Sequence, residues 1–350
     1  MRVHTREGEA PKLLSSHMNL DKVLDNQNQL LATTGLYRSE FDELFKAFEP
    51  RWHQAFKHFS TQGKRRKLPL TSKQIAKDTK DLHGPKMKLF FILNHFKVNS
   101  IQHNEAVMYD LDQPRVSRWI KLLMPVLHQA IVDLHLHPAR TSDEMIRLFR
   151  NRQHPDSLVD KPATTTLNAD GTDRLLSRSV DWETQKNDFS GKHKVHTIKN
   201  SVICDEIQFI HFLGYTWRGA IHDKSMLENE FPNFTNAAFK SQWLLKDTGY
   251  QGYIPDGIHS IEPYKKKAGQ ELYEWQKEFN TWVSSLRVVI ENAIGGAKRL
   301  RILVDKTRGF YLKKFDQAIE IAAGLHNFRV TRRQTTYACA LDRVRVNLKN

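Results

Sequence analysis

The pattern of apolar residues changes along the chain from a helical repeat to the alternation typical of strands, and this change constrains the fold most. From Phe41 to Phe59 the apolar positions recur every three or four residues, which predicts an amphipathic helix. Beyond a boundary at about 138–160, the segments 193–204 and 207–215 are β-branched and aromatic, which predicts a hairpin. We therefore expect an all-α region followed by a mixed α/β domain.

The order of elements in the second half predicts one kind of sheet. A Thr-rich strand at 164–173 precedes the hairpin, and a helix at 219–230 and a short buried strand at 243–250 follow it. Strand, strand, strand, helix, strand is the order of the ribonuclease-H-like fold, whose first and fourth strands are neighbours at the sheet centre. We expect such an α/β fold, a mixed sheet flanked by helices, with Asp170 and Asp247 ending those two strands.

The composition indicates which class of partner the protein binds and in which cellular compartment it works. The 54 Lys and Arg residues against 39 Asp and Glu give a net charge of +15 and a pI of about 9.7, which favours a polyanion, with nucleic acid first. An ordinary basic protein is the alternative. Two cysteines, Cys204 and Cys339, are too few for a disulfide framework or a thiolate zinc finger, which favours a reducing compartment. Because no apolar run suits a membrane span or signal peptide, we expect a soluble intracellular protein.

Two short helices are predicted at 100–109 and 114–127, joined by a tight turn, in the layout of a helix-turn-helix. The residues expected to reach DNA from the second helix are Arg115, Ser117 and Arg118. An ordinary helical hairpin is the alternative. The basic run GKRRK at 63–67 fits either a phosphate contact or a solvated loop.

The expected domain organisation has three parts. They are a helical or partly disordered arm at 1–60, a helix-turn-helix DNA-binding domain at 61–140 and a catalytic domain at 160–335.

A predicted helix at 271–301 presents Arg287, Glu291 and Lys298 on one face, although chance alignment of charges gives the same pattern. Gly295-Gly296 weakens that helix, so that Lys298 could lie past a kink or a cap. With Asp170 and Asp247, Glu291 would complete a set of three carboxylates able to hold two magnesium or manganese ions. Arg287 and Lys298 would grip the DNA strand being cut.

Other residues are weaker candidates for metal binding or catalysis. His193 and His196 lie three apart on an expected strand, so they face opposite sides and would not share a metal. Asp223, after His222, is either a helix N-cap or a fourth acid at the metal site. Neither a Walker loop nor a GxSxG elbow occurs, so ATP dependence is not indicated.

Five blocks resemble, in the same order, those of bacterial insertion-sequence transposases related to the Harbinger group. The blocks span about 165–330 and are NADGTD with its following residues, IHDKSMLEN, LLKDTGYQGY, LRVVIENAIGGAKRLRI and AAGLHNFRV. The region 71–135 is similar to the helix-turn-helix that precedes the catalytic domain in these enzymes. The resemblance implies a ribonuclease-H-like core, two divalent metal ions (magnesium or manganese), hydrolysis at the ends of a mobile element and strand transfer into target DNA.

The resemblance also implies roles for particular residues. Asp170, in DGT, matches the first acid and Glu291 the last, while Asp247, in KDTGY, is chosen as the second. Asp223, in HDKS, matches a recurrent block and could supply a further metal ligand. Ser284 stands where a related signature has Tyr, which removes an aromatic but no acid.

The expected partners are double-stranded DNA, both element ends and target, and further copies of the chain, because transposition brings two ends together. The expected location is the bacterial cytoplasm, in association with the nucleoid. Two other functions fit the same residues: a transposase-derived DNA-binding protein without activity, and a metal-dependent endonuclease.

Overall fold

The computed structural model describes residues 19–60, 62, 64–77, 81–153, 166–230, 239, 242–253, 255–267, 269–307 and 312–333. The expectation of a helical or partly disordered arm at 1–60 thus falls outside the described residues over its first 18 positions. Within the described part of the chain, no helix is long and apolar enough to span a membrane.

The described chain up to residue 153 is helical, as the apolar repeat predicts. Its helices are α1 (Leu20–Asp25), α2 (Gln27–Thr34), α3 (Arg38–His58), α4 (Ser72–Lys77), α5 (Gly84–Val98), α6 (Gln102–Met108), α7 (Gln113–Asp133) and α8 (Ser142–Gln153). The stripe that predicted α3 is buried at Phe41, Phe48 and Phe56, because these side chains lie on one face of the helix. Phe59, the end of that stripe, is 40% exposed because α3 stops one residue before it.

The two helices expected to form a helix-turn-helix are α6 and α7. Asp112 caps α7 by accepting a hydrogen bond from the Arg115 N–H at 2.7 Å, and Pro114 occupies the first turn, where its missing N–H costs nothing. The helix continues to Asp133, six residues beyond the expected end, even though Pro125 lies inside it. Its inner face, including Val116 and Leu123, is fully buried. The longer helix results from packing of its second half against another segment, described next.

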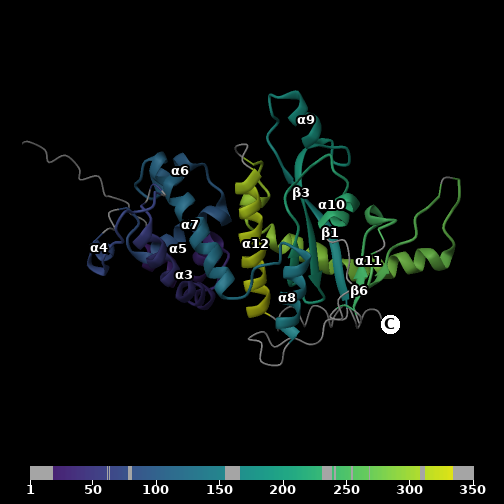
Figure 1. Ribbon diagram of the computed structural model, residues 1–350, viewed down its shortest axis with the longest axis horizontal. Coiled ribbons are helices and arrows are strands. Elements are labelled where there is room, and N and C mark those ends of the chain that lie inside the picture. Colours follow the sequence, from purple (N-terminus) through teal and green to yellow (C-terminus); the bar gives the residue numbers. More distant parts are fainter. Residues whose placement is uncertain are drawn as a thin grey trace, which may run out of the picture.

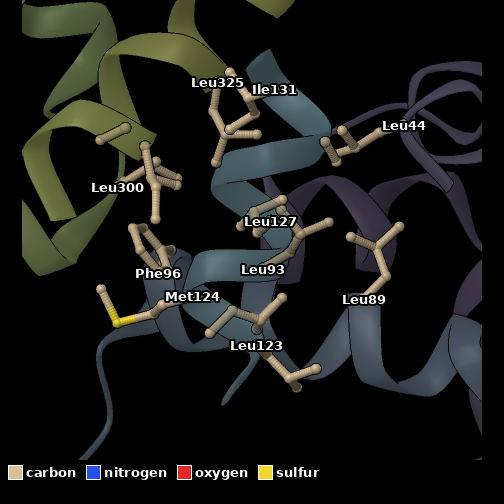
Figure 2. Packing of buried hydrophobic residues seen from close by; sticks show 14 of the residues in the cluster. Leu44, Leu89, Leu93, Phe96, Leu123, Met124, Leu127, Ile131, Leu300 and Leu325 are labelled. Atoms are coloured by element: carbon tan, nitrogen blue, oxygen red, sulfur yellow. The ribbon is translucent and has the colours of Figure 1, made fainter. Parts of the chain in front are cut away.

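The helical region shares one hydrophobic core with the C-terminal helices α11 (Glu274–Ala297) and α12 (Leu312–Arg332). Figure 1 shows α12, in yellow, standing between the N-terminal helices and the sheet. Figure 2 shows side chains from both regions in this core, among them Leu127 and Ile131 of α7 and Leu325 of α12. A Cβ at Gly324 of α12 would lie 2.4 Å from Ile131 Cγ2, so glycine permits the close approach of these two helices.

A seven-stranded mixed sheet forms the rest. Its strands are β1 (Thr166–Leu175), β2 (Phe189–Ser190), β3 (Val195–Asp205), β4 (Ile210–Leu213), β5 (Trp217–Arg218), β6 (Trp243–Leu245) and β7 (His259–Ile261). β1 pairs antiparallel with β3, whose other edge pairs with β2, β5 and β4. β6 runs parallel to β1 and to β7. The adjacency of the first and fourth predicted strands is confirmed, and the sheet is compatible with the expected ribonuclease-H-like arrangement.

Several expected boundaries are wrong. β1 continues to Leu175, because it pairs with β3 along that whole length, so Asp170 lies inside the strand and not at its end. The strand expected at 243–250 ends at Leu245, and Thr248–Tyr250 form the short 3-10 helix η2. The helix α10 starts at Asp223 and not at Gly219, because β5 and a turn precede it. The short elements α9 (Trp182–Asp188) and β7 were not expected from the sequence.

Two neighbouring glycines of α11 test the packing of α11 against α12. A Cβ at Gly296 would lie 2.3 Å from Nδ1 of His326, a buried ring that cannot retreat because Nε2 is bonded to the Gln208 carbonyl. Gly296→Ala should therefore lower the free energy of unfolding by about 1–3 kcal/mol. Gly295→Ala is the matched control, since a Cβ there meets nothing within 4 Å, and it should stabilise the helix by about 0.5–1 kcal/mol. Denaturant unfolding of both variants measures the difference, and equal effects would contradict the packing described.

Candidate active site

Asp170 and Asp247 are brought together by the parallel pairing of β1 with β6. The last paired residues are Asn168 of β1 and Leu245 of β6, and each aspartate lies two residues beyond its own. Because side chains alternate along a strand, a step of two keeps both on the same face. The carboxylates therefore lie beside one another, as the element order predicted.

Arg287 of α11 joins these two carboxylates. Its Nη2 donates to Asp170 Oδ2 at 3.0 Å and its Nη1 donates to Asp247 Oδ1 at 3.3 Å. The Arg287 side chain is only 12% exposed, so the guanidinium lies between the helix and the sheet and partly neutralises both acids. Sequence reasoning expected Arg287 to face DNA. In the structure it is bonded to the acids.

Glu291 lies one helical turn beyond Arg287 and lines the same cleft as the two aspartates. The cleft has a volume of about 800 Å³, and its walls include Lys192, Asp173 and Lys298. The Glu291 side chain is exposed to solvent. Within the described ranges, no three acidic, histidine or cysteine side chains stand close enough together to form a metal cluster as they are. Glu291 therefore shares the cleft with the two aspartates without joining their ion pairs.

The Asp170 carboxyl resists ionisation. Burial raises its pKa to about 6, against the stabilising charge of Arg287 and the hydrogen bond from the Gly171 N–H. The like charges of Asp247 and Asp223 raise it further. A cation placed among these groups would favour the ionised form of Asp170 more strongly than Arg287 alone does.

Asp223 approaches the site from the other face of β1. A Cβ at Gly171 would lie 3.2 Å from Asp223 Cγ, so the glycine of the DGT motif makes room for this carboxylate. Asp223 is the first residue of α10, and its Oδ1 accepts a hydrogen bond from Lys199 Nζ at 3.1 Å. Lys199 lies on β3 and is 6% exposed, and sequence reasoning gave no signal for it because the contact joins distant segments.

Tyr250 is a second residue that sequence reasoning missed. Its ring is 1% exposed, and its hydroxyl has no hydrogen-bond partner among the described residues. Burial raises its pKa well above the usual value, and the charges of Asp170, Asp223 and Asp247 raise it further. The phenol thus lies within electrostatic range of all three carboxylates. Its position in the KDTGY block, three residues after Asp247, is the signal that could have found it.

The remaining candidates are divided between the cleft and the helical region. Lys298 is the C-cap of α11, and its Nζ donates to the Asp173 carbonyl at 3.0 Å, so it is turned onto β1. His193 lies in the turn before β3 and not in a strand, with Nε2 at 3.3 Å from Asp173 Oδ2. The expected DNA-reading residues Arg115, Ser117 and Arg118 lie on α7 and do not line the cleft.

The raised pKa of Asp170 predicts a pH-dependent stability. Because the folded-state pKa of about 6 exceeds the ordinary value of 3.8 for an aspartate, the wild type loses stability as pH rises through this range. Asp170→Asn removes that loss. The free energy of unfolding of the variant, relative to that of wild type, should therefore be higher at neutral pH than at pH about 4, by up to about 3 kcal/mol. Denaturant unfolding in EDTA across this range measures it. A pH-independent difference would contradict the burial of an ionisable group.

Comparisons with known proteins concern the part of the chain that contains this cleft. Residues 169–327 match the family model described as DDE superfamily endonuclease. Over 152 residues the chain is 34% identical to the probable transposase for insertion sequence element IS702 of Microchaete diplosiphon. This match covers 42% of the chain and 52% of the relative, so the chain spans about half the length of the curated relative it matches. No solved structure matches the chain. Residues 169–327 are therefore similar to the DDE superfamily endonucleases, and part of the chain is similar to a probable insertion-sequence transposase.

Proposed function

We propose that the protein is a DNA transposase that hydrolyses DNA at the ends of a mobile element and transfers the 3′ ends into target DNA. The observation that carries the proposal is the convergence of Asp170 and Asp247 at equivalent positions beyond β1 and β6, with Glu291 in the same cleft. The similarity of residues 169–327 to the DDE superfamily endonucleases supports hydrolysis of DNA as the reaction class.

The donor set of the cleft suits a hard divalent cation. Carboxylate oxygens are the ligands that magnesium and manganese prefer, and Asp170 and Asp247 are near enough to share one guanidinium. In this proposal Asp170, Asp247 and Glu291 hold two such ions, which would activate the attacking oxygen and stabilise the leaving one. Asp223 is a further candidate ligand, and its ion pair with Lys199 would open for it to bind.

Arg287 has two tasks in this proposal. It keeps the two aspartates in place by offering each a hydrogen bond, and it offsets their mutual repulsion while no other cation is present. If the acids held a metal ion, the Arg287 guanidinium would be free to bind a phosphate in the cleft, as expected from the sequence. Lys298, held on β1 through the Asp173 carbonyl, adds positive charge to the same wall.

The proposal also includes how DNA is held. The helices α6 and α7 would act as a helix-turn-helix that binds the terminal inverted repeats, with Arg115, Ser117 and Arg118 near the start of α7. Two or more copies of the chain would pair the two ends of the element. Similarity to a probable transposase and to the DDE superfamily endonucleases supports double-stranded DNA as the substrate.

Substitution of the acids tests the catalytic assignment. Asp170→Asn, Asp247→Asn and Glu291→Gln should each slow metal-dependent cleavage of a duplex carrying the element's terminal repeats by more than about a hundredfold. The loss should be this large because removing even an outer-shell partner of a metal ligand costs 10- to 100-fold. Asp173→Asn is the matched control in the same cleft, where the carboxylate accepts a hydrogen bond from Thr197 and contacts His193. It should change the rate only several-fold. Equal losses in all four variants would refute the assignment.

Product analysis separates the transposase from the endonuclease and from an inactive DNA-binding protein. With magnesium or manganese, a transposase yields molecules in which the element's 3′ end is joined to target DNA. Cleavage without joined product would leave the endonuclease, and binding without any product would leave the DNA-binding protein. Asp170→Asn should bind the terminal repeat nearly as tightly as wild type, because the substitution removes a ligand and leaves the fold intact.

A further inference from the structure

A groove of about 770 Å³ lies between the second half of α3 and the middle of α7, in the helical region and apart from the acidic cleft. Its floor contains the apolar side chains of Leu122 and Val126, which are buried. Its walls are basic, and the cationic or ionisable basic residues among its lining are Arg51, His58, Arg65, Arg118 and Lys121. No carboxylate among the described residues lines this groove.

Arg65, within the basic run of the sequence, lines the groove because the chain folds back onto the end of α3. Arg65 pairs with Phe59 in an isolated antiparallel bridge, and the Arg66 N–H donates to the His58 carbonyl at 2.8 Å. The Arg66 guanidinium stacks over Phe56 and donates to the Phe59 carbonyl at 3.2 Å. Arg66 therefore anchors the loop, and Arg65 is held among the groove residues opposite α7.

The positive charges of the groove differ in their surroundings from Arg115 at the start of α7. Arg115 lies near Asp112 and Asp81, at 3.3 and 3.6 Å, so its charge is already compensated. In the groove, Arg51 is bound by Asp133. Arg65, Arg118 and Lys121, by contrast, form no ion pair with any described residue. Uncompensated positive charge thus faces the groove from both of its walls.

We propose that this groove binds the phosphate backbone of duplex DNA, with Arg65, Arg118 and Lys121 as its phosphate contacts. The proposal rests on the proposed function in one respect, that DNA is the substrate, and it places the backbone contact of Arg118 in the α3–α7 groove, together with Lys121 and with Arg65 of the facing wall. Three cations on two facing walls, without a carboxylate between them, suit successive phosphates of one strand. Such contacts hold DNA without reading its sequence, so they would serve the ends and the target alike.

Salt dependence of binding tests the groove. The probe is a short labelled duplex of arbitrary sequence, titrated with the full chain in EDTA, so that binding is measured where no cleavage occurs. The triple variant Arg65→Ala, Arg118→Ala, Lys121→Ala should weaken binding at least tenfold at low salt. It should also lower the slope of log affinity against log salt by about 2–3, because each phosphate contact contributes about 0.9.

A matched control removes the same charge elsewhere. Lys22, Lys186 and Lys313 are exposed and do not line the groove, so their replacement by alanine should leave the slope within about one unit of wild type. Both variants should keep the melting temperature of wild type, which shows that the fold is intact. Equal effects of the two variants, or a wild-type slope in the groove variant, would overturn the proposal.

The test of duplex binding does not depend on whether the proposed catalytic acids are active. A groove variant that loses backbone binding while wild type fails to cleave in any metal would uphold the groove and refute the transposase. The reverse pattern, wild-type cleavage with an unaltered slope, would refute the groove alone. A wild-type chain that binds no duplex would refute the groove as well.

Discussion

The parallel pairing of β1 with β6 determines where the candidate active site lies on the sheet. Three residues of each strand are paired, and this short contact fixes where the two aspartates lie. A shift of one residue in this register would place Asp170 and Asp247 on different faces of the sheet, because side chains alternate. The neighbouring antiparallel strand β3 extends over nine paired positions of β1 and keeps that strand straight past the point where β6 ends. The acids therefore project from a rigid support.

Burial of the acids has an electrostatic cost that the protein offsets from another element. Arg287 comes from α11, and its guanidinium is bonded to both carboxylates at the edge of the sheet. Burial and like charge nevertheless keep the Asp170 pKa near 6. A site with this balance favours the binding of further positive charge, which is the property that a metal-dependent nuclease requires. The same helix carries Glu291, so the placement of α11 sets both the counter-charge and the third acid.

The helical region is joined to this site by packing and not by a linker alone. α12 contacts α7 on one side and α11 on the other, and all three contribute to one core. The glycines at 296 and 324 allow these helices to come closer than any side chain would permit. The α3–α7 groove and the acidic cleft therefore belong to one packed body. If the groove binds DNA, that DNA has a defined orientation relative to the cleft.

The sequence predicted this arrangement where the signal was local or followed from the order of elements. The order of strand and helix patterns predicts that Asp170 and Asp247 lie on neighbouring strands. The helical periodicity of α11 predicts that Arg287 and Glu291 share one face. The full length of β1 depends on its pairing with β3, which no local pattern encodes. Likewise, the Arg287 ion pairs, the Lys199 contact with Asp223 and the burial of Tyr250 arise from packing of distant segments. Sequence alone likewise does not show that Arg115 of α7 is paired with Asp81, whereas Arg118 of the same helix forms no ion pair with a described residue.

Direct measurement of manganese binding tests the central claim, that Asp170 and Asp247 form a cation site together. The electron paramagnetic resonance signal of free manganese, titrated with protein near neutral pH, reports the bound fraction without any DNA or turnover. We expect manganese to bind to wild type and to Asp173→Asn, and its binding to be strongly reduced in both Asp170→Asn and Asp247→Asn. Equal manganese binding by all four proteins would contradict it, because the two aspartates would then have no part in holding a cation.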